Sequence, residues 1–352
     1  MEENLQKIYQ RMDDPLSREI FIDRLNYSVT HEYHYLEKMV DRTVRNSGRW
    51  KKFCGILQDR AQLGDIYLFG AGIWGNTLYK ETKGQIQWRG VIDNQPKGKV
   101  MADLEIMTLE QFMERCNDNT TVVISSYKNG QEMSAQLRSG GIKQDSIIDA
   151  GTVIYWLTEG AVYFDLEQLY PQADFETFVD AGCFDGLTTQ AFFQWCKTKG
   201  YAYCFEPDGK NAEVVRKNLI NCAGRYELAE KALWSTEMDL CIDERGNCAS
   251  SVREDNGTGG SPMTAAVALD DYLAGKQVTY IKMDVEGAEA EVLKGARNTI
   301  TCCRPRLAVS IYHRTEDIFA LPELILTYYP GYRFYMRHYS FSDYDTVLYA
   351  VP

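Results

Sequence analysis

Residues 176–196, ETFVDAGCFDGLTTQAFFQWC, contain a short apolar strand, a glycine turn and the beginning of a helix. The strand ends on Asp180, the turn contains Gly182 and Gly186, and the helix begins at Leu187. This DxGxxxG pattern differs from the GxGxxG of dinucleotide sites. The difference matters because a carboxylate at the strand end repels a pyrophosphate. The same carboxylate attracts a cationic ligand or accepts its hydrogen bonds. The stretch therefore predicts a parallel α/β sheet that binds an amino-acid-bearing sulfonium at its strand ends.

The next two strands carry groups that suit an adenosyl ligand. YAYCFEP (201–207) reaches Glu206 at the spacing where a second-strand carboxylate accepts both hydroxyls of a ribose. YELAEKALWS (226–235) supplies a third strand and a turn around Ala232 and Leu233, whose backbone and apolar side chains could hold an adenine. Open α/β sheets bind ligands at the carboxyl ends of their strands, so we expect these residues to share one site.

VTYIKMDVEGAEAEVLKGA (278–296) is the densest pattern in the chain, a strand that ends on Asp284 and is followed by a helix. Lys282 is unexpected here, because the central strands of a parallel sheet are normally apolar on both faces. A buried ammonium group requires a partner. We therefore predict that Lys282 pairs with Asp180 or Glu286.

The run RPRLAVSIYHR (304–314) predicts a fifth strand that ends near His313, one of only four histidines. His313 could take a proton from a hydroxyl group, since the intrinsic pKa of histidine lies near neutrality. The alternative is a surface histidine satisfied by a neighbouring group. A metal ion held by Asp284, Glu286 and His313 is conceivable, but their spacing is not a recognised zinc pattern, so we predict no metal site.

A second glycine turn lies in DIYLFGAGIWGNTLYKE (65–81), which combines a strand, a complete GxGxxG and a helix. Its glycines are Gly70, Gly72 and Gly75. Asp93 ends the following strand, at a spacing that suits a carboxylate reaching ribose hydroxyls. This shape would hold a nucleotide or nucleotide-sugar at a helix N-terminus, but the same glycines also serve to pack a helix on a strand.

The chain length of 352 residues indicates about two domains. Residues 1–60 repeat apolar positions at helical spacing and are expected to form a helical N-terminal segment. We expect a small parallel α/β domain over 61–150, a connecting segment over 151–174 and a second domain over 175–352. Within the second domain, residues 238–268 predict a hairpin with a mobile loop, NGTGGSP, and the last strands predict a terminal antiparallel hairpin.

Composition excludes several classes of protein. The charged residues comprise 38 Lys and Arg against 50 Asp and Glu, a net charge of −12 that opposes binding to nucleic acid. No stretch reaches the ~20 apolar residues that span a bilayer, and the first residues lack the pattern of a secretory signal. Ten cysteines without a CxxC pair predict reduced thiols in a cytoplasmic protein. Two copies could pair through the helical N-terminus.

Taken together, six motifs in the last half of the chain resemble the FkbM-type S-adenosylmethionine-dependent methyltransferases. They are DAGCFDG (180–186), CFEP (204–207), KALWS (231–235), ALDDYL (268–273), IKMDVEGAEAEVLKGA (281–296) and IYH (311–313). The resemblance implies a class I, Rossmann-like sheet of seven strands with the last strand antiparallel, preceded by the smaller Rossmann-like domain and the helical segment. It also implies S-adenosyl-L-methionine as methyl donor and O-methylation of a sugar, glycan or related hydroxyl-bearing metabolite.

The resemblance carries over to particular positions. The expected cofactor-binding residues are Asp180, Ala181, Gly182, Cys183, Phe184, Gly186, Glu206, Pro207, Ala232 and Leu233. Asp284 would face the reacting centre, and Asp284 and His313 are the expected catalytic residues. One departure is visible: where the family often has Asn in the first loop, this chain has Phe184, which could instead stack against the donor.

Two rival functions remain open. The first is a nucleotide-dependent oxidoreductase or epimerase that works through Gly70, Gly72, Gly75 and Asp93. The second is a catalytically silent glycan-binding protein that retains the fold. The strand-end acids Asp180, Glu206 and Asp284 argue against the second.

Overall fold

The computed structural model describes residues 2–352 except 97, 99, 161, 198, 244, 246–249 and 255–261. The chain divides into two compact units. The larger unit combines residues 2–40 with 162–352, and the smaller unit contains 41–160. The helical segment at the N-terminus is therefore shared between the two units.

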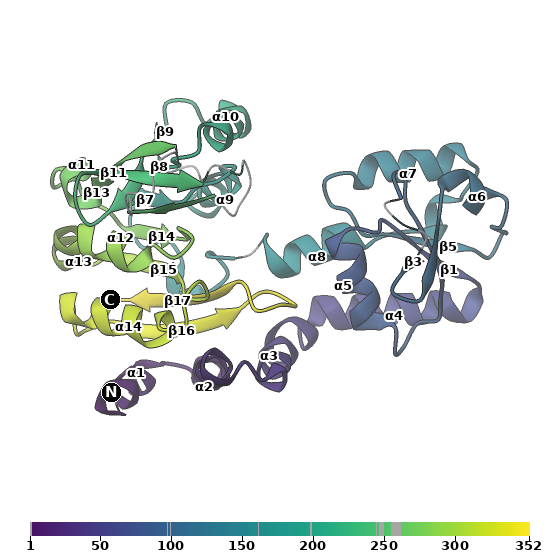
Figure 1. Ribbon diagram of the computed structural model, residues 1–352, viewed down its shortest axis with the longest axis horizontal. Helices are drawn as coiled ribbons and strands as arrows, with labels where there is room; N and C mark the ends of the chain where they lie inside the picture. The colour runs from purple at the N-terminus through teal and green to yellow at the C-terminus, as the bar shows by residue number, and fades with distance from the viewer. Residues whose placement is uncertain are drawn as a thin grey trace. The chain divides into compact units, whose positions relative to one another are not determined.

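The smaller unit is built on a sheet with the strand order β3-β4-β2-β1-β5-β6 within the described residues. Figure 1 shows helices packed around this sheet. All strand pairs are parallel except β3 with β4. Its strands are β1 Ile66–Phe69, β2 Trp88–Ile92, β3 Val100–Met101, β4 Leu104–Met107, β5 Thr121–Ile124 and β6 Ile147–Asp149. Its helices are η1 Asp41–Arg45, α4 Gly48–Leu63, α5 Ile73–Thr82, α6 Leu109–Met113, α7 Gly130–Ser139, η2 Gln144–Ser146 and α8 Ala150–Thr158. The predicted parallel α/β architecture is confirmed, whereas the sequence analysis missed β3, β4 and α6.

The larger unit contains a sheet of seven described strands in the order β16-β17-β15-β14-β7-β8-β9. The strand β17 runs antiparallel to β15 and β16, and the other neighbours are parallel. The bounds are β7 Glu176–Ala181, β8 Gly200–Phe205, β9 Tyr226–Ala229, β14 Tyr280–Met283, β15 Arg306–Ser310, β16 Arg333–His338 and β17 Thr346–Val351. The predicted Rossmann-like sheet with an antiparallel last strand is confirmed.

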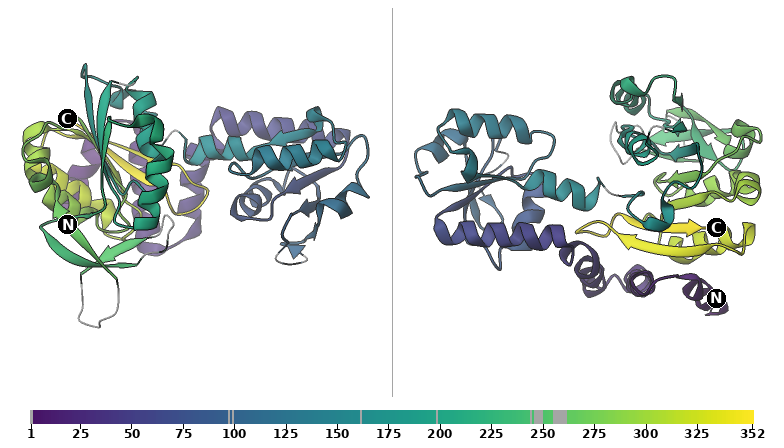
Figure 2. Two further views of the ribbon diagram at one scale, coloured as in Figure 1. Left: turned by 90° about the horizontal axis from the view of Figure 1, so that it is seen from above. Right: turned by 180° about the vertical axis from the view of Figure 1, so that it is seen from behind.

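Helices cover both faces of this sheet (Figure 2). They are η3 Glu167–Leu169, α9 Leu187–Trp195, α10 Gly209–Asn218, η4 Ile220–Cys222, α11 Leu269–Leu273, α12 Glu289–Gly295, α13 Arg297–Cys303 and α14 Asp317–Tyr328. Such a three-layer arrangement buries parallel strands on both faces, and every residue of β14 and β15 is buried. Both strands deliver their carboxyl ends to one edge of the sheet.

A smaller sheet, β10-β13-β11-β12, lies beside the main one. Its strands are β10 Ala232–Trp234, β11 Met238–Asp243, β12 Ser251–Arg253 and β13 Met263–Ala268. The antiparallel pairing of β11 with β12 confirms the predicted hairpin. Most of the loop NGTGGSP, for which we predicted mobility, lies outside the described residues.

The helices α1 Glu2–Arg11, α2 Pro15–Thr30 and α3 Tyr33–Val40 belong to the larger unit. The helix α2 begins at Pro15, and the side chain of Asp14 caps it by accepting a hydrogen bond from the Ser17 amide at 2.7 Å. Asp14 also binds Arg337 at 2.8 Å, which ties the helix to β16. Figure 2 shows these helices beside the C-terminal hairpin. None of the described helices is both long and apolar enough to cross a membrane.

Candidate functional site

An open pocket lies at the carboxyl ends of β7, β8 and β14 and at the start of β10 in the larger unit. It is lined by Gly182, Phe184, Phe205, Glu206, Pro207, Asn211, Lys231, Ala232, Leu233, Ser250, Val252, Asp284, Val285 and Glu286. Segments far apart in the sequence therefore meet at this pocket.

The turn after β7 comes close to the segment after β14. Gly182 has a φ of +76°, and a Cβ atom at this position would lie 2.0 Å from the carbonyl oxygen of Asp284. Only glycine fits such an approach, which explains the first glycine of the DxGxxxG pattern. Gly186 also has a positive φ, of +77°, and caps the start of α9.

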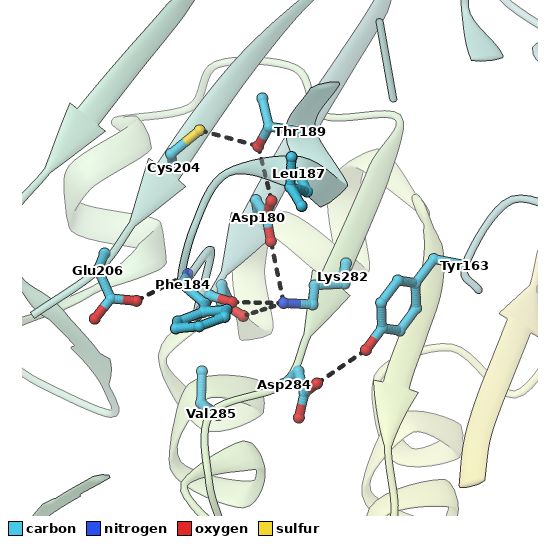
Figure 3. Close-up of polar contacts among 12 residues, drawn as sticks. Tyr163, Asp180, Phe184, Leu187, Thr189, Cys204, Glu206, Lys282, Asp284 and Val285 are labelled. Carbon is cyan, nitrogen blue, oxygen red and sulfur yellow. Dashed lines mark hydrogen bonds and ion pairs between the residues drawn. The ribbon is translucent and has the colours of Figure 1, made fainter. Parts of the chain in front are cut away.

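Phe184 follows in the same turn and lines the pocket. Its φ of +49° is unusual for a bulky residue, whereas asparagine tolerates this left-handed conformation. The amide of Phe184 donates a hydrogen bond to Oε2 of Glu206 at 2.9 Å (Figure 3).

Glu206 lines the pocket from the end of β8. Its Oε1 atom accepts hydrogen bonds from the amide of Asp208 at 3.0 Å and from the side chain of Asn211 at 3.4 Å. Burial raises the pKa of Glu206 to about 7, against the lowering effect of these hydrogen bonds. A ligand that donates hydrogen bonds to the carboxylate would favour its ionised form.

Asp180 does not line the pocket, because its side chain is buried and turned toward Lys282 and Thr189 (Figure 3). Oδ1 of Asp180 lies 3.2 Å from Nζ of Lys282, which confirms the predicted ion pair. Nζ of Lys282 also donates to the carbonyl oxygens of Ala181, at 3.4 Å, and Gly182, at 2.6 Å. Burial lowers the pKa of Lys282, but nearby carboxylates outweigh it and the net pKa is raised. Asp180 thus fixes the turn through Lys282.

Two tyrosine hydroxyls hold the carboxylate of Asp284. Tyr163 donates to Oδ2 at 2.9 Å, and Tyr312 donates to Oδ1 at 3.2 Å. Tyr163 is buried and has a φ of +76°, a costly conformation for an aromatic residue. Strained backbone that the surrounding structure enforces is concentrated at functional sites. Asp284 therefore presents its carboxylate to the pocket in a fixed orientation.

His313 lies behind Asp284, with 9% of its side chain exposed. Its Nδ1 is 2.9 Å from Oε1 of Glu289, and its Nε2 is 3.5 Å from Asp284 and 3.7 Å from Glu286. Nε2 has no partner at hydrogen-bonding geometry among the described residues. Burial lowers the pKa of His313, but Glu286 and Glu289 raise it to about 11. The carboxylates thus make this corner strongly attractive to positive charge.

The structure brings most of the expected site residues to the pocket. Those that line it are Gly182, Phe184, Glu206, Pro207, Ala232, Leu233 and Asp284. Ala181, Cys183 and Gly186 belong to the same turn but are not among the lining residues, and neither is Asp180. Sequence reasoning missed Tyr163, because the connecting segment has no periodic pattern, and it missed Asn211 and Ser250, which follow no strand end.

The glycine turn of the smaller unit is packed on its own elements. A Cβ atom on Gly75 would lie 1.9 Å from the carbonyl oxygen of Gly70, so close helix–strand packing explains this glycine. The carboxylate of Asp93 accepts hydrogen bonds from the amides of Ala71 and Gln95, each at 2.8 Å. These contacts therefore support a packing role for the glycines. They give no support to nucleotide binding at this turn.

Comparisons with known proteins agree with the site. Residues 180–342 match the model of the methyltransferase FkbM domain. A search of curated proteins found no match to the chain. Similar solved structures include a methyltransferase FkbM from Methylobacillus flagellatus KT, with 18% identity, a TM-score of 0.49 and coverage of 96% of this chain and 99% of that one.

Two further structures are more distant. Aeropyrum pernix fibrillarin, in complex with natively bound S-adenosyl-L-methionine, has 11% identity, a TM-score of 0.36 and coverage of 55% of this chain and 73% of that one. A SAH-bound methyltransferase of Podospora anserina has 10% identity, a TM-score of 0.30 and coverage of 69% and 92%. The matched domain contains every strand-end acid discussed above, from Asp180 to Glu286. Residues 180–342 of this chain are therefore similar to the methyltransferase FkbM domain.

Proposed function

We propose that the pocket of the larger unit binds S-adenosyl-L-methionine and that the protein methylates a hydroxyl group of a sugar, glycan or related metabolite. The observation that carries this proposal is the position of two acids in one pocket. Glu206 stands at the end of β8 and Asp284 at the end of β14. One acid suits the ribose of a donor, and the other suits the hydroxyl of an acceptor.

The residues present fit the donor. Glu206 would accept hydrogen bonds from the ribose hydroxyls, and Ala232 and Leu233 would contact the adenine from β10. Gly182 leaves room for the backbone to approach the ligand. Asp180 and Lys282 would act indirectly, by holding the carbonyl groups of this turn in place.

When bound, the donor supplies a methyl group on a positively charged sulfur. The protein then has to align an acceptor oxygen with that methyl group and remove the hydroxyl proton. Alignment of two reactants supplies about 7–11 kcal/mol in well-oriented systems. We propose that Asp284 and His313 form the acceptor side, where the carboxylate of Asp284, fixed by Tyr163 and Tyr312, receives the proton.

Calorimetry and a transfer assay test this function together. Titration with S-adenosyl-L-methionine should show one binding site, which Glu206→Ala removes and Asp284→Asn leaves intact. Mass spectrometry of monosaccharides, nucleotide-sugars and glycans incubated with donor should show a methyl ether that Asp284→Asn does not form. His313→Ala should lower the rate while the donor still binds. Failure of the folded wild-type protein to bind the donor, or methylation of nitrogen or carbon only, would contradict the proposal.

A further inference from the structure

Three side chains at the acceptor side of the pocket have the arrangement of a metal site. Asp284 follows β14, Glu286 lies in the next turn, and His313 follows β15. Each offers one ligand atom, and these atoms all lie within 4.8 Å of one another. The sequence analysis named these three residues but predicted no metal site, because His313 is 29 positions from Asp284 and the group forms no recognised spacing motif.

Glu289 prepares the imidazole of His313 for ligation. The 2.9 Å contact between Oε1 of Glu289 and Nδ1 of His313 keeps a proton on Nδ1, so a metal ion that binds Nε2 has to displace only the proton on that nitrogen. A carboxylate behind the distal nitrogen is the usual support of a metal-binding histidine. Oε1 of Glu289 also accepts a hydrogen bond from the amide of Val285 at 3.0 Å, so its position is fixed by the backbone.

The distances from Nε2 of His313 to the two nearby carboxylate oxygens suit ligand atoms around one metal ion better than they suit hydrogen bonds. Nε2 of His313 is 3.5 Å from Oδ1 of Asp284 and 3.7 Å from Oε1 of Glu286, and it has no hydrogen-bond partner among the described residues. Ligand atoms that lie about 2.1 Å from a metal ion are about 3.0–3.5 Å apart in octahedral or tetrahedral geometry. The two distances from Nε2 of His313 are therefore close to those between ligands of one ion, and all three ligand atoms lie within 4.8 Å of one another.

The backbone holds Glu286 in an unusual conformation at this corner. Glu286 has a φ of +54°, and Gly287 has a φ of +94°. A left-handed glutamate is uncommon outside functional sites. Its side chain is partly exposed to the pocket, whereas that of His313 is nine-tenths buried. The turn therefore places one accessible carboxylate opposite one buried imidazole.

We propose that Asp284, Glu286 and His313 bind a divalent first-row transition-metal ion, such as Mn²⁺, through two carboxylate oxygens and one imidazole nitrogen. Mixed nitrogen and oxygen ligands of this kind suit such ions. In terms of the methyltransferase function proposed above, on which this role depends, the ion would hold the acceptor hydroxyl oxygen and make its proton more acidic. The remaining positions of the ion would be open to water or to the acceptor.

Binding of the metal alone tests the proposal. The full chain is stripped with a chelator and titrated with Mn²⁺, and free Mn²⁺ is followed by electron paramagnetic resonance. We expect one bound ion per chain. Glu286→Gln and Glu289→Gln should each weaken binding at least ~10-fold, the first by loss of a ligand and the second by loss of the support behind His313.

The matched control is Glu291→Gln, because Glu291 lies on the same helix as Glu289 but pairs with Lys294. This variant should bind Mn²⁺ with wild-type affinity. Spin-echo spectra of the bound ion should show nitrogen coupling that His313→Ala abolishes. Absence of Mn²⁺ binding by the folded wild-type chain would overturn the proposal, and so would equal affinity in Glu286→Gln, or bound Mn²⁺ without nitrogen coupling.

The design separates this proposal from the methyltransferase function. Mn²⁺ binding is measured without donor, and donor binding is measured by calorimetry in the presence of chelator. Donor binding without Mn²⁺ binding would refute only the metal site. Mn²⁺ binding without donor binding would refute the proposed donor site while the ligand assignment stands.

Discussion

The hydroxyl of Tyr163 donates a hydrogen bond to Oδ2 of Asp284 across 121 positions of the sequence. The same tyrosine is anchored twice through its backbone, since its amide donates to Tyr349 and its carbonyl accepts from Tyr280. Its positive φ is therefore enforced by neighbours on two strands of the main sheet. Tyr163 thus positions the carboxylate of Asp284, the group that we propose to receive the proton of the acceptor.

Tyr163→Phe removes this hydrogen bond and keeps the ring. Hydrogen bonds to charged groups contribute about 1.5–3 kcal/mol, so we expect kcat to fall by about 10–100-fold with unchanged donor affinity. Tyr332→Phe is the control, because its buried hydroxyl donates to the Pro305 carbonyl, away from the pocket. The positioning role is established if Tyr163→Phe and Tyr332→Phe lower the free energy of unfolding equally but Tyr163→Phe alone lowers kcat. An unchanged kcat in Tyr163→Phe would refute it.

The buried pair of Lys282 and Asp180 makes a strong prediction for stability. Lys282→Met leaves the carboxylate of Asp180 without its cation in the centre of the sheet, and loss of one partner of such a pair costs about 3–5 kcal/mol. We expect this loss in urea unfolding, with partial recovery when Asp180→Asn is added. Lys294→Met removes an exposed pair with Glu291 and should cost less than about 1 kcal/mol. Similar losses of unfolding free energy in Lys282→Met and Lys294→Met would contradict the assignment of a buried ion pair to Lys282 and Asp180.

The pairing of Lys282 could be predicted from the sequence because it follows from a general rule. A cation inside a buried strand needs a carboxylate, and the parallel register places Lys282 beside Asp180 on β7. Strand ends could be predicted for a similar reason, since the apolar runs and the glycine turns mark them. This local information was enough for the parallel sheets and for Glu206 and Asp284 at the pocket.

Other features depend on contacts between distant segments, which no local pattern encodes. The sequence analysis expected Asp180 both to bind the cofactor and to be a candidate partner of Lys282, because strand-end position alone does not distinguish a carboxylate that faces a pocket from one that binds a neighbouring lysine. The gathering of Asp284, Glu286 and His313 required the register of β14 and β15. The division of the N-terminal helices between two units likewise depends on packing, since helical periodicity identifies an apolar face but not its partner.

Glu206 predicts how donor binding depends on pH. Its pKa is raised to about 7 by burial, so below pH 7 the carboxyl is mostly protonated in the free protein. A donor whose ribose hydroxyls bind the carboxylate must displace that proton. Donor affinity should therefore rise up to ~10-fold per pH unit as pH approaches 7 from below, and level off above it.

Calorimetry in buffers of different ionisation enthalpy would show the accompanying proton release. Glu206→Gln should bind more weakly and lose this pH dependence. Glu230→Gln, which changes an exposed acid paired with Arg216, should retain the dependence. Proton uptake on binding, or an unchanged profile in Glu206→Gln, would show that this carboxyl does not contact the ribose.

His338 predicts a separate pH dependence, of stability rather than binding. The side chain is buried at the end of β16, with Nδ1 2.9 Å from Oγ1 of Thr346. Burial, together with the positive charge of Arg24, lowers the pKa of His338 to about 3. Between that value and the ordinary value of about 6.5, the unfolded chain binds a proton that the native protein does not, so unfolding becomes easier as pH falls. This group alone should lower the free energy of unfolding by about 1.4 kcal/mol per pH unit below pH 6.5.

Urea unfolding at pH 7, 6 and 5 would measure how the free energy of unfolding depends on pH. The variant His338→Asn keeps a polar atom near Thr346 but does not titrate, so its slope should be shallower by that amount. Because the other acids titrate in both proteins, parallel slopes would mean that His338 is protonated in the native state.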